Sequence, residues 1–566
     1  MEANLKNSYS IIRNFLKEKY PLFIIILLLF FYGINNYIWL MLNKLPPTTD
    51  QTFHLLNNLK YLDILTNPSW DIFARLRRVH TFYPPFFTFC VAIVNLAFGH
   101  SVTTSIMTNM FFAAILFFSI YYIGRKWEDE KTGLFAVFIV SMYPYVFGLS
   151  RVFFLEFALT ALVCFSFCCL IYTDNFNHRI YSVLFGISVG IGMLIKQAFI
   201  FFLAGPLILT LINILWNHKI ASIRRKVILN LGIAFITPLV IAGDWYFHHG
   251  LETWHSYCRL DKFFNGPQLF YSISYYFHLL VLDQIGPFFA ILSLLGLIYL
   301  LKKNQKLQLL DLLLWFIVPY IFLLLLNIRY MYYTVPNLPA VALISSLGIS
   351  GIKNRYTKRV LLFLVIIWAM VQYFVISYTS PDSTKLRVSF PTTVKIRNCF
   401  LGPETWFEFS QPCHILPIAD FFYHFPRGGD WNLDGMIWAI ERNNRDHRKS
   451  IIGVTDGLLH EKKVSWFDPD PRQLEASWRD NFLVVNNYAI EYYVRSKKLP
   501  YEVIGLTSSE IDWMNLPLLD FIVSVKEIEV IAPLIAQYYE MIFKAIVPDG
   551  SPVFVYKKMR NINDAS

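Results

Sequence analysis

The sequence predicts a mainly α-helical membrane domain of about eleven spans, followed by a soluble α/β domain. Three observations lead to this fold class. Hydrophobic residues make up 55% of the 566 residues and charged residues only 16%, whereas roughly a quarter of a soluble protein is charged. The apolar residues gather in long runs up to about residue 380, after which the chain is polar. The net charge of +11 lies in short clusters between these runs, which indicates orientation in a bilayer rather than nucleic-acid binding.

The first apolar run, from Pro21 to about Leu42, predicts a retained membrane span. It is about 20 residues long, which is too long for a signal peptide, and it lacks a small-residue cleavage site. Further runs of spanning length cover residues 104–123, 133–149, 155–173, 181–195, 198–216, 227–246, 279–301, 308–327, 331–350 and 360–378. Together they predict eleven spans in a membrane domain of residues 1–380.

Residues 84–98 form an additional apolar segment of about 15 residues, whose length does not decide whether it crosses. If it does not cross, all clear basic clusters lie on the side of the N-terminus, including Lys219 to Lys226 and Lys353 to Arg359. If it crosses, these clusters move to the other side. Because basic loops are cytoplasmic, we interpret residues 84–98 as a re-entrant or interfacial helix. The N-terminus is then cytoplasmic and the C-terminus lies outside, across what the composition suggests is a bacterial inner membrane.

The polar tail, residues 381–566, predicts an extracytoplasmic α/β domain that is large enough to bury its own core. Helix-like patterns occur at Leu433 to Glu441 and Ile531 to Phe543. Short β-rich stretches occur at 450–454, 482–485, 502–504, 521–523 and 553–556. In an oxidising compartment Cys399 and Cys413 either form a disulfide or remain as buried thiols.

Asp50 stands in the first external loop, residues 43–83, at the start of a segment whose apolar residues share one helical face. This pattern predicts an amphipathic helix in the outer interface. The Asp50 carboxylate can cap that helix by accepting from backbone N–H groups. A carboxylate fixed at a helix start beside the bilayer is also a well-held general base, so the two roles are compatible.

Ionisable residues also gather at the predicted outer ends of other spans. Arg151 and Glu156 follow the third span, where we expect them to face a cavity or to form a structural ion pair. Lys196 lies in a tight hairpin and is either an interface anchor or a phosphate ligand. Arg329 lies among tyrosines, where it either binds a lipid phosphate or belongs to an interfacial belt. Arg259 is a further candidate anion contact in the loop 247–278.

A proline pair joins the first external loop to the short apolar helix. Pro84 and Pro85 follow Tyr83 and pre-set the backbone for a helix start, or alternatively form only a rigid turn. No cysteine or histidine cluster in the sequence has metal-ligand spacing.

In their serial order, these segments resemble the membrane-embedded C-type glycosyltransferases, in the group of the protein O-mannosyltransferases and lipid A aminoarabinose transferases. The resemblance covers roughly residues 20–380. It is carried by Asp50, Tyr83 to Phe87, Gly124 to Leu159, Gly186 to Lys196 and Arg329 to Ile344.

The resemblance implies an inverting transferase that moves a sugar from a polyprenyl-phosphate donor to a hydroxyl of a protein, lipid or glycan on the outer face. It places the general base on Asp50. Basic groups must offset the charge that gathers on the leaving phosphate, and the candidates are Arg329, Lys196 and Arg151. The candidates for the rest of the substrate site are Glu156, Tyr83, His54 and Arg259.

Three positions depart from the family pattern. Gln51 follows Asp50 where the family commonly has an acidic residue, which removes a possible metal ligand, so we expect no cofactor and no obligatory divalent ion. Glu156 stands where an aspartate is common. Tyr83 replaces a lysine that is frequent in the lipid A branch, which weakens a lipid A assignment.

Two other functions fit a polytopic membrane protein. One is a lipid or oligosaccharide transporter or flippase, and the other is a membrane-anchored glycan-binding scaffold. Transporters place ionisable groups near the midplane and often contain internal repeats. The sequence shows no internal repeat and gathers its polar residues at one membrane face, which favours chemistry on a lipid substrate.

Overall fold

The computed structural model separates the chain into two units, residues 1–39 with 68–425 and residues 40–67 with 426–566. We call them the membrane unit and the C-terminal unit. The structure describes residues 2–47, 49–79, 82–217, 225–259, 269–303, 306–324, 330–378, 389–397, 406–414, 431–444, 450–455, 487–506, 519–524, 538–547 and 552–559.

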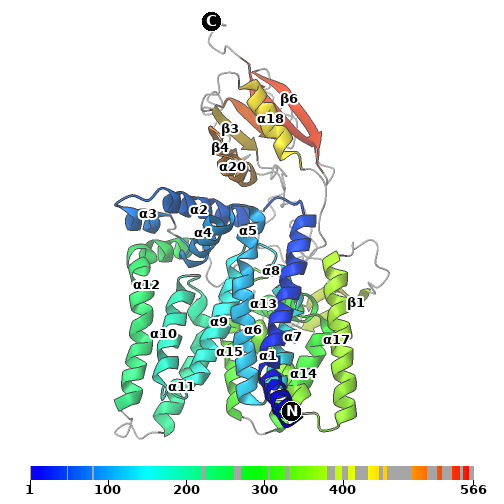
Figure 1. The fold of residues 1–566 in the computed structure, drawn as a ribbon. Helices are drawn as coiled ribbons and strands as arrows, with labels where there is room; N and C mark the ends of the chain where they lie inside the picture. The colour runs from blue at the N-terminus through cyan, green and yellow to red at the C-terminus, as the bar shows by residue number, and fades with distance from the viewer. Residues whose placement is uncertain are drawn as a thin grey trace. The chain divides into compact units, whose positions relative to one another are not determined.

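The membrane unit is built from helices, the longest of which run roughly alongside one another (Figure 1). Its helices are α1 (Glu2–Leu42), α3 (Ile72–Arg78), α4 (Phe86–Phe98), α5 (Val102–Met107), α6 (Asn109–Trp127), α7 (Glu130–Ser141), α8 (Pro144–Leu149), α9 (Leu155–Tyr172), α10 (Arg179–Met193), α11 (Phe199–Asn217), α12 (Arg225–Arg259), α13 (Leu269–His278), the π-helix η3 (Leu279–Gln284), α14 (Pro287–Lys302), α15 (Lys306–Leu324), the 3-10 helix η4 (Val335–Asn337), α16 (Leu338–Ser350) and α17 (Arg355–Tyr378). An antiparallel pair, β1 (Ser389–Arg397) and β2 (Trp406–His414), follows.

Seven helices among the described residues are long and apolar enough to cross a membrane, so this is an integral multi-pass membrane protein. They are α1, α5 with α6, α9, α11, α12, α15 and α17. The other four predicted spans fall on short or broken helices. For example, η3 and α14 belong to a pair that bends by 109°, at a break where Gly286 has a φ of +85° and Pro287 starts the new helix.

The segment interpreted as re-entrant forms helix α4 of 13 residues, which starts directly after Pro85 and stops at Gly99. At 1.5 Å per residue it is about 20 Å long, shorter than a hydrocarbon core of about 30 Å. This length agrees with an interfacial or re-entrant helix.

The C-terminal unit is an α/β body, as predicted. Its sheet has the order β4-β3-β5-β7-β6, in which β3 runs parallel to β4 and β5, and β7 runs antiparallel to β5 and β6. The elements of this unit are α2 (Thr49–Thr66), α18 (Leu433–Asn443), β3 (Ser450–Thr455), α20 (Asn487–Ser496), β4 (Tyr501–Leu506), β5 (Phe521–Ser524), β6 (Tyr539–Ile546) and β7 (Pro552–Lys558). Its core contains Met436, Ile440, Ile452, Val454, Phe521, Val523, Val553 and Val555.

Two features of this unit differ from the sequence-based expectation. The helix predicted over Ile531 to Phe543 is wrong at its C-terminal end, where β6 begins at Tyr539, because pairing with β7 outweighs the local helical pattern. Helix α2, which follows the first span, packs against α20 and so groups with the tail. The division of the chain at residue 380 stays a prediction. Cys399 lies outside the described residues, and only the backbone of Cys413 is described, in β2.

Candidate active site

A buried ion pair joins two of the predicted site residues in the membrane unit. The Lys196 ammonium lies 2.6 Å from a carboxylate oxygen of Glu156, and the two residues are 6% and 3% exposed. Glu156 is in the first turn of α9, where the helix dipole favours a negative charge. Each buried charge requires the other as its partner, because an unpaired buried charge destabilises the fold by about 3–5 kcal/mol. The pairing therefore fixes the position of both side chains.

The turn that carries Lys196 also holds the proline segment. Helix α10 ends at Met193 and α11 starts at Phe199, so Lys196 lies in the connection between them. In this turn the Leu194 carbonyl accepts from the Phe86 N–H at 2.9 Å. The Gln197 side chain donates to the Phe82 carbonyl at 2.6 Å.

These two bonds determine where helix α4 begins. The first N–H groups of a helix have no partner within it, and the Leu194 carbonyl supplies one for Phe86. The segment that contains Tyr83, Pro84 and Pro85 is thus fixed beside the ion pair. The Tyr83 ring lies 4.7 Å from the ring of Phe82, with the two planes perpendicular.

Tyrosines from a distant part of the chain surround the Lys196 ammonium. Its nitrogen lies 4.6 Å from the ring centroid of Tyr333 and 5.7 Å from that of Tyr332, within the range of a cation–π attraction. The turn that bears these rings is held by Gln284, which donates to the Thr334 hydroxyl at 2.7 Å. The tyrosines after Arg329 therefore belong to the same site, although Arg329 lies outside the described residues.

Arg151 is buried elsewhere in the membrane unit and does not contact Glu156. It is 1% exposed and donates to the Asn36 side chain at 2.9 Å, to the Ser377 hydroxyl at 2.8 Å and to the Tyr373 hydroxyl at 2.6 Å. Asn36 also donates to the Ser150 hydroxyl. Arg151 thus connects α1 and α17 to the start of α9, which is the arrangement expected of a positioning residue.

Asp50 and His54 lie on α2, in the C-terminal unit. Asp50 is exposed in the first turn of this helix rather than before it, so its carboxylate faces the positive end of the helix dipole. His54 is buried, with its ring 5.6 Å from that of Phe53. Arg259 is the last residue of α12, and its side chain is not described. The described residues contain no group of three or more metal-ligating side chains.

Several contributing residues were not anticipated from the sequence. Gln197 and Gln284 hold the turns around Lys196, and Asn36 and Tyr373 hold Arg151. Asn36 could have been found, because a polar side chain within an apolar span requires a partner. The glutamines carried no signal, since each bonds to a residue more than 40 positions away.

The comparison with protein families gives one match in this region. A family model described as "Dolichyl-phosphate-mannose-protein mannosyltransferase" matches residues 83–242, which include Tyr83, Arg151, Glu156 and Lys196. No curated protein shows significant similarity to the chain.

Solved structures of two membrane proteins are also similar to the chain. One is ArnT from Cupriavidus metallidurans in the apo state, at 13% identity and a TM-score of 0.46, over 63% of this chain and 66% of that one. The chain thus spans just under two thirds of ArnT. The other is the archaeal oligosaccharyltransferase AglB from Archaeoglobus fulgidus, at 13% identity and a TM-score of 0.47, over 97% and 75% of the two chains.

At these identities the assignment rests on the family model and on the residues of the chain itself. The match over residues 83–242 confirms the predicted resemblance to membrane glycosyltransferases and, at the level of the class, the prediction of a transferase.

Proposed function

We propose that this protein transfers a sugar from a polyprenyl-phosphate donor to an acceptor hydroxyl at the outer face of the membrane, with inversion at the anomeric carbon. Asp50 accepts the proton of the acceptor hydroxyl, whose oxygen attacks the anomeric carbon. The bond from that carbon to the phosphate oxygen breaks, and polyprenyl phosphate leaves with the electron pair. One negative charge passes from the base to the departing phosphate, so the reaction needs no cofactor.

The observation that carries this proposal is the buried pair of Lys196 and Glu156 beside the proline segment. An ammonium has three N–H donors, and Glu156 accepts one of them, so Lys196 can contact a phosphate oxygen without leaving the carboxylate. A cation held in a poorly hydrated site stabilises the leaving phosphate by several kcal/mol, because no reorganisation is needed during the reaction. We place Arg329 and Arg259 as further phosphate contacts, and Arg151 as a positioning residue that holds α1 and α17 at the start of α9.

The neighbouring residues favour a lipid-linked donor over a free nucleotide sugar. The pair lies among aromatic side chains, Phe154, Tyr332 and Tyr333, and beside helices that are apolar enough to span a membrane. In the solved relatives, one ArnT structure is bound to undecaprenyl phosphate and one AglB structure holds a dolichol-phosphate and an inhibitory peptide. A prenyl chain is compatible with such surroundings.

The test is a transfer assay in proteoliposomes that contain the purified full chain, a polyprenyl-phosphate sugar and extracts of candidate acceptors. Asp50→Asn should abolish transfer. Asp63→Asn, which removes an exposed carboxylate from the same helix, is the matched control and should transfer normally. If both variants transfer like the unchanged protein, the assignment of Asp50 is wrong. A transporter would instead move the lipid across the vesicle membrane without releasing polyprenyl phosphate.

A further inference from the structure

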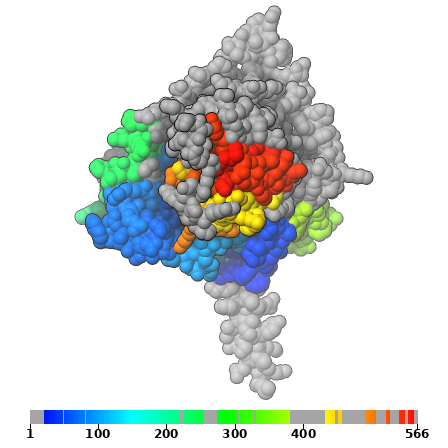
Figure 2. Space-filling view, turned by 90° about the horizontal axis from the view of Figure 1, so that it is seen from above, coloured from blue at the N-terminus to red at the C-terminus, as the bar shows by residue number. Residues whose placement is uncertain are grey.

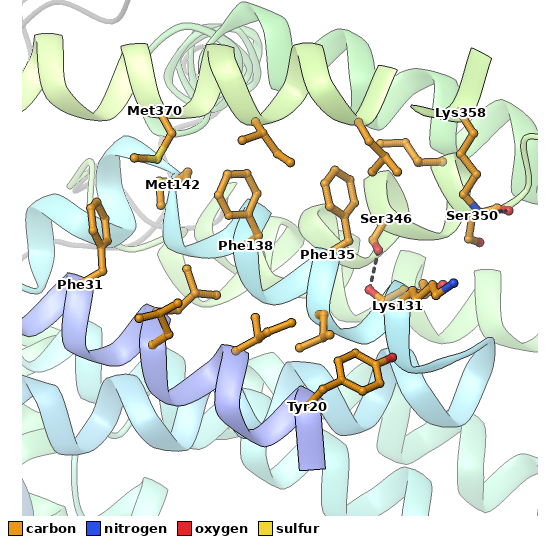
Figure 3. A pocket seen from close by; sticks show the side chains of 18 residues that line it. Tyr20, Phe31, Lys131, Phe135, Phe138, Met142, Ser346, Ser350, Lys358 and Met370 are labelled. Atoms are coloured by element: carbon orange, nitrogen blue, oxygen red, sulfur yellow. Dashed lines mark hydrogen bonds between the residues drawn. The ribbon is translucent and has the colours of Figure 1, made fainter. Parts of the chain in front are cut away.

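A cavity lies at the end of the membrane unit where the basic loops are found. It has a volume of about 600 Å³, is partly open, and is lined by residues of α1, α7, α16 and α17. Figure 3 shows apolar side chains along its length, among them Phe31, Phe135, Phe138 and Met370. The polar groups Tyr20, Lys131, Ser350 and Lys358 gather at one end of the cavity (Figure 3).

The arrangement of helix ends explains this polarity. Tyr20 begins the apolar part of α1, Lys131 is in the first turn of α7, and Lys358 is in the first turn of α17. Ser350 ends α16, and its carbonyl accepts from the Lys358 ammonium at 2.9 Å. The ends of α7, α16 and α17 thus lie beside Tyr20 of α1, and the cavity runs from there along apolar side chains.

The charge at this opening is positive after the acidic side chains are assigned to their partners. Glu128 pairs with Lys303 at 2.7 Å, and Glu130 pairs with Arg125 at 3.5 Å. Asp129 accepts from the Thr132 N–H and caps α7. Glu130 also accepts a hydrogen bond from Tyr20, so the carboxylates at the opening are Asp129 and Glu130, and the cations Lys131, Lys358 and Arg125 exceed them by one charge.

The neighbouring groups change the pKa of the Asp129 carboxyl. Burial would raise the pKa of its carboxyl, but hydrogen bonds from Thr132 and the charges of Lys358 and Lys131 lower it overall. Asp129 is therefore ionised and already has a hydrogen-bonding role. An anion that approaches the two lysines does not have to displace it from Thr132.

The length of the cavity matches one leaflet. Lys358 and Met370 line its two ends and are 12 positions apart on α17, which is about 18 Å along a helix axis. One leaflet contributes about half of a hydrocarbon core of roughly 30 Å. If the lysines hold the headgroup of a lipid, its acyl chain would run along the cavity past Phe135, Phe138 and Met142.

We propose that this cavity binds an anionic glycerophospholipid, with its phosphate on Lys131 and Lys358 and one acyl chain between α1, α7, α16 and α17. The occupant is a structural or regulatory lipid rather than the sugar donor. Lys131 is at the start of α7, whereas the pair of Glu156 and Lys196 lies beyond the other end of that helix, after α8.

Native mass spectrometry of the purified full chain tests this site. The protein is titrated with phosphatidylglycerol, or with phosphatidylcholine of the same acyl chains. The double variant Lys131→Gln/Lys358→Gln should bind phosphatidylglycerol about 30-fold more weakly, given the usual contribution of each lysine near an anionic lipid. The control Lys353→Gln/Arg355→Gln removes the same charge from two exposed positions, one just before α17 and one at its first residue, and should change binding little.

A second pair of variants tests the acyl-chain position. Leu362→Trp adds volume to the cavity wall and should reduce phosphatidylglycerol binding, whereas Leu364→Trp, at a position 50% exposed on the same helix, should not. If Lys131→Gln/Lys358→Gln and Lys353→Gln/Arg355→Gln weaken phosphatidylglycerol binding equally, the proposal is overturned, because the lipid then responds to the overall surface charge and not to this site. Binding that is unchanged in Leu362→Trp, or a site that takes only polyprenyl phosphate, would also overturn it.

Discussion

The ion pair of Glu156 and Lys196 gives the sharpest quantitative prediction for stability. Lys196→Met keeps most of the side-chain volume but leaves the Glu156 carboxylate buried without its cation. Removing one partner of a buried pair costs about 3–5 kcal/mol. At about 2 °C per kcal/mol, the lower end of the range for large domains, this corresponds to a fall of roughly 6–10 °C in the melting temperature.

The double variant Lys196→Met/Glu156→Leu should recover most of that stability. Replacing both charges with apolar side chains of similar volume is often neutral, because the desolvation cost of both ions disappears together. The two substitutions should therefore be strongly non-additive, with a coupling energy of about 2–3 kcal/mol. Sugar transfer should not recover, because the phosphate then lacks its cation.

A matched control is available on the surface of the same unit. Lys303 and Glu128 lie 2.7 Å apart, almost the same separation as in the buried pair, but their side chains are 30% and 26% exposed. Lys303→Met should cost at most about 1 kcal/mol, since an exposed pair gains little. Both pairs are measured by thermal unfolding in detergent with a thiol-reactive dye. If Lys196→Met and Lys303→Met lower the melting temperature equally, the argument from burial is refuted.

Three further predictions concern the frame around the site. Arg151→Lys should lower the melting temperature, because lysine cannot reach Asn36, Ser377 and Tyr373 together, and should leave the Michaelis constant for the donor unchanged. A large change in that constant would instead indicate that Arg151 contacts the substrate. Gly348→Ala should reduce the yield of monodisperse protein in size-exclusion chromatography, since the added methyl group would lie 2.3 Å from the Gly296 Cα. The control Gly232→Ala adds a methyl group with no atom within 4 Å and should be neutral, so equal yields would contradict the close packing of α14 and α16. Removing residues 431–566 deprives α2 of its packing against α20, so the inserted protein should lose transfer; transfer that persists would show that the tail is dispensable.

The general architecture could be predicted from the sequence because apolar length is a strong signal. Each of the eleven predicted spans falls on a helix or on a pair of broken helices. The positions at which a predicted span divides into two helices were harder to predict from the sequence, although Pro144 and Pro287 mark two of them as first residues of new helices. The strand at Tyr539 was missed because its pairing with β7 is decided by tertiary contacts and not by local pattern.

The candidate site could be predicted only in part. Glu156 and Lys196 were each identified as ionisable residues at span ends, but their pairing was not, because 40 residues and a complete helical hairpin separate them. Arg151 is closer to Glu156 in the chain but bonds to α1 and α17 instead. Similarly, the packing of α2 against α20 joins segments more than 400 positions apart, and no local property of either helix indicates it.

The central claim is that Lys196 binds the donor phosphate while Asp50 performs the proton transfer, and one measurement separates these roles. Binding of polyprenyl phosphate to the full chain is measured by native mass spectrometry for Asp50→Asn and Lys196→Met, beside transfer by the same preparations. The account predicts that Asp50→Asn binds the lipid like the unchanged protein but transfers no sugar, whereas Lys196→Met binds it at least tenfold more weakly. Normal lipid binding by Lys196→Met, together with normal transfer by Asp50→Asn, would contradict the account.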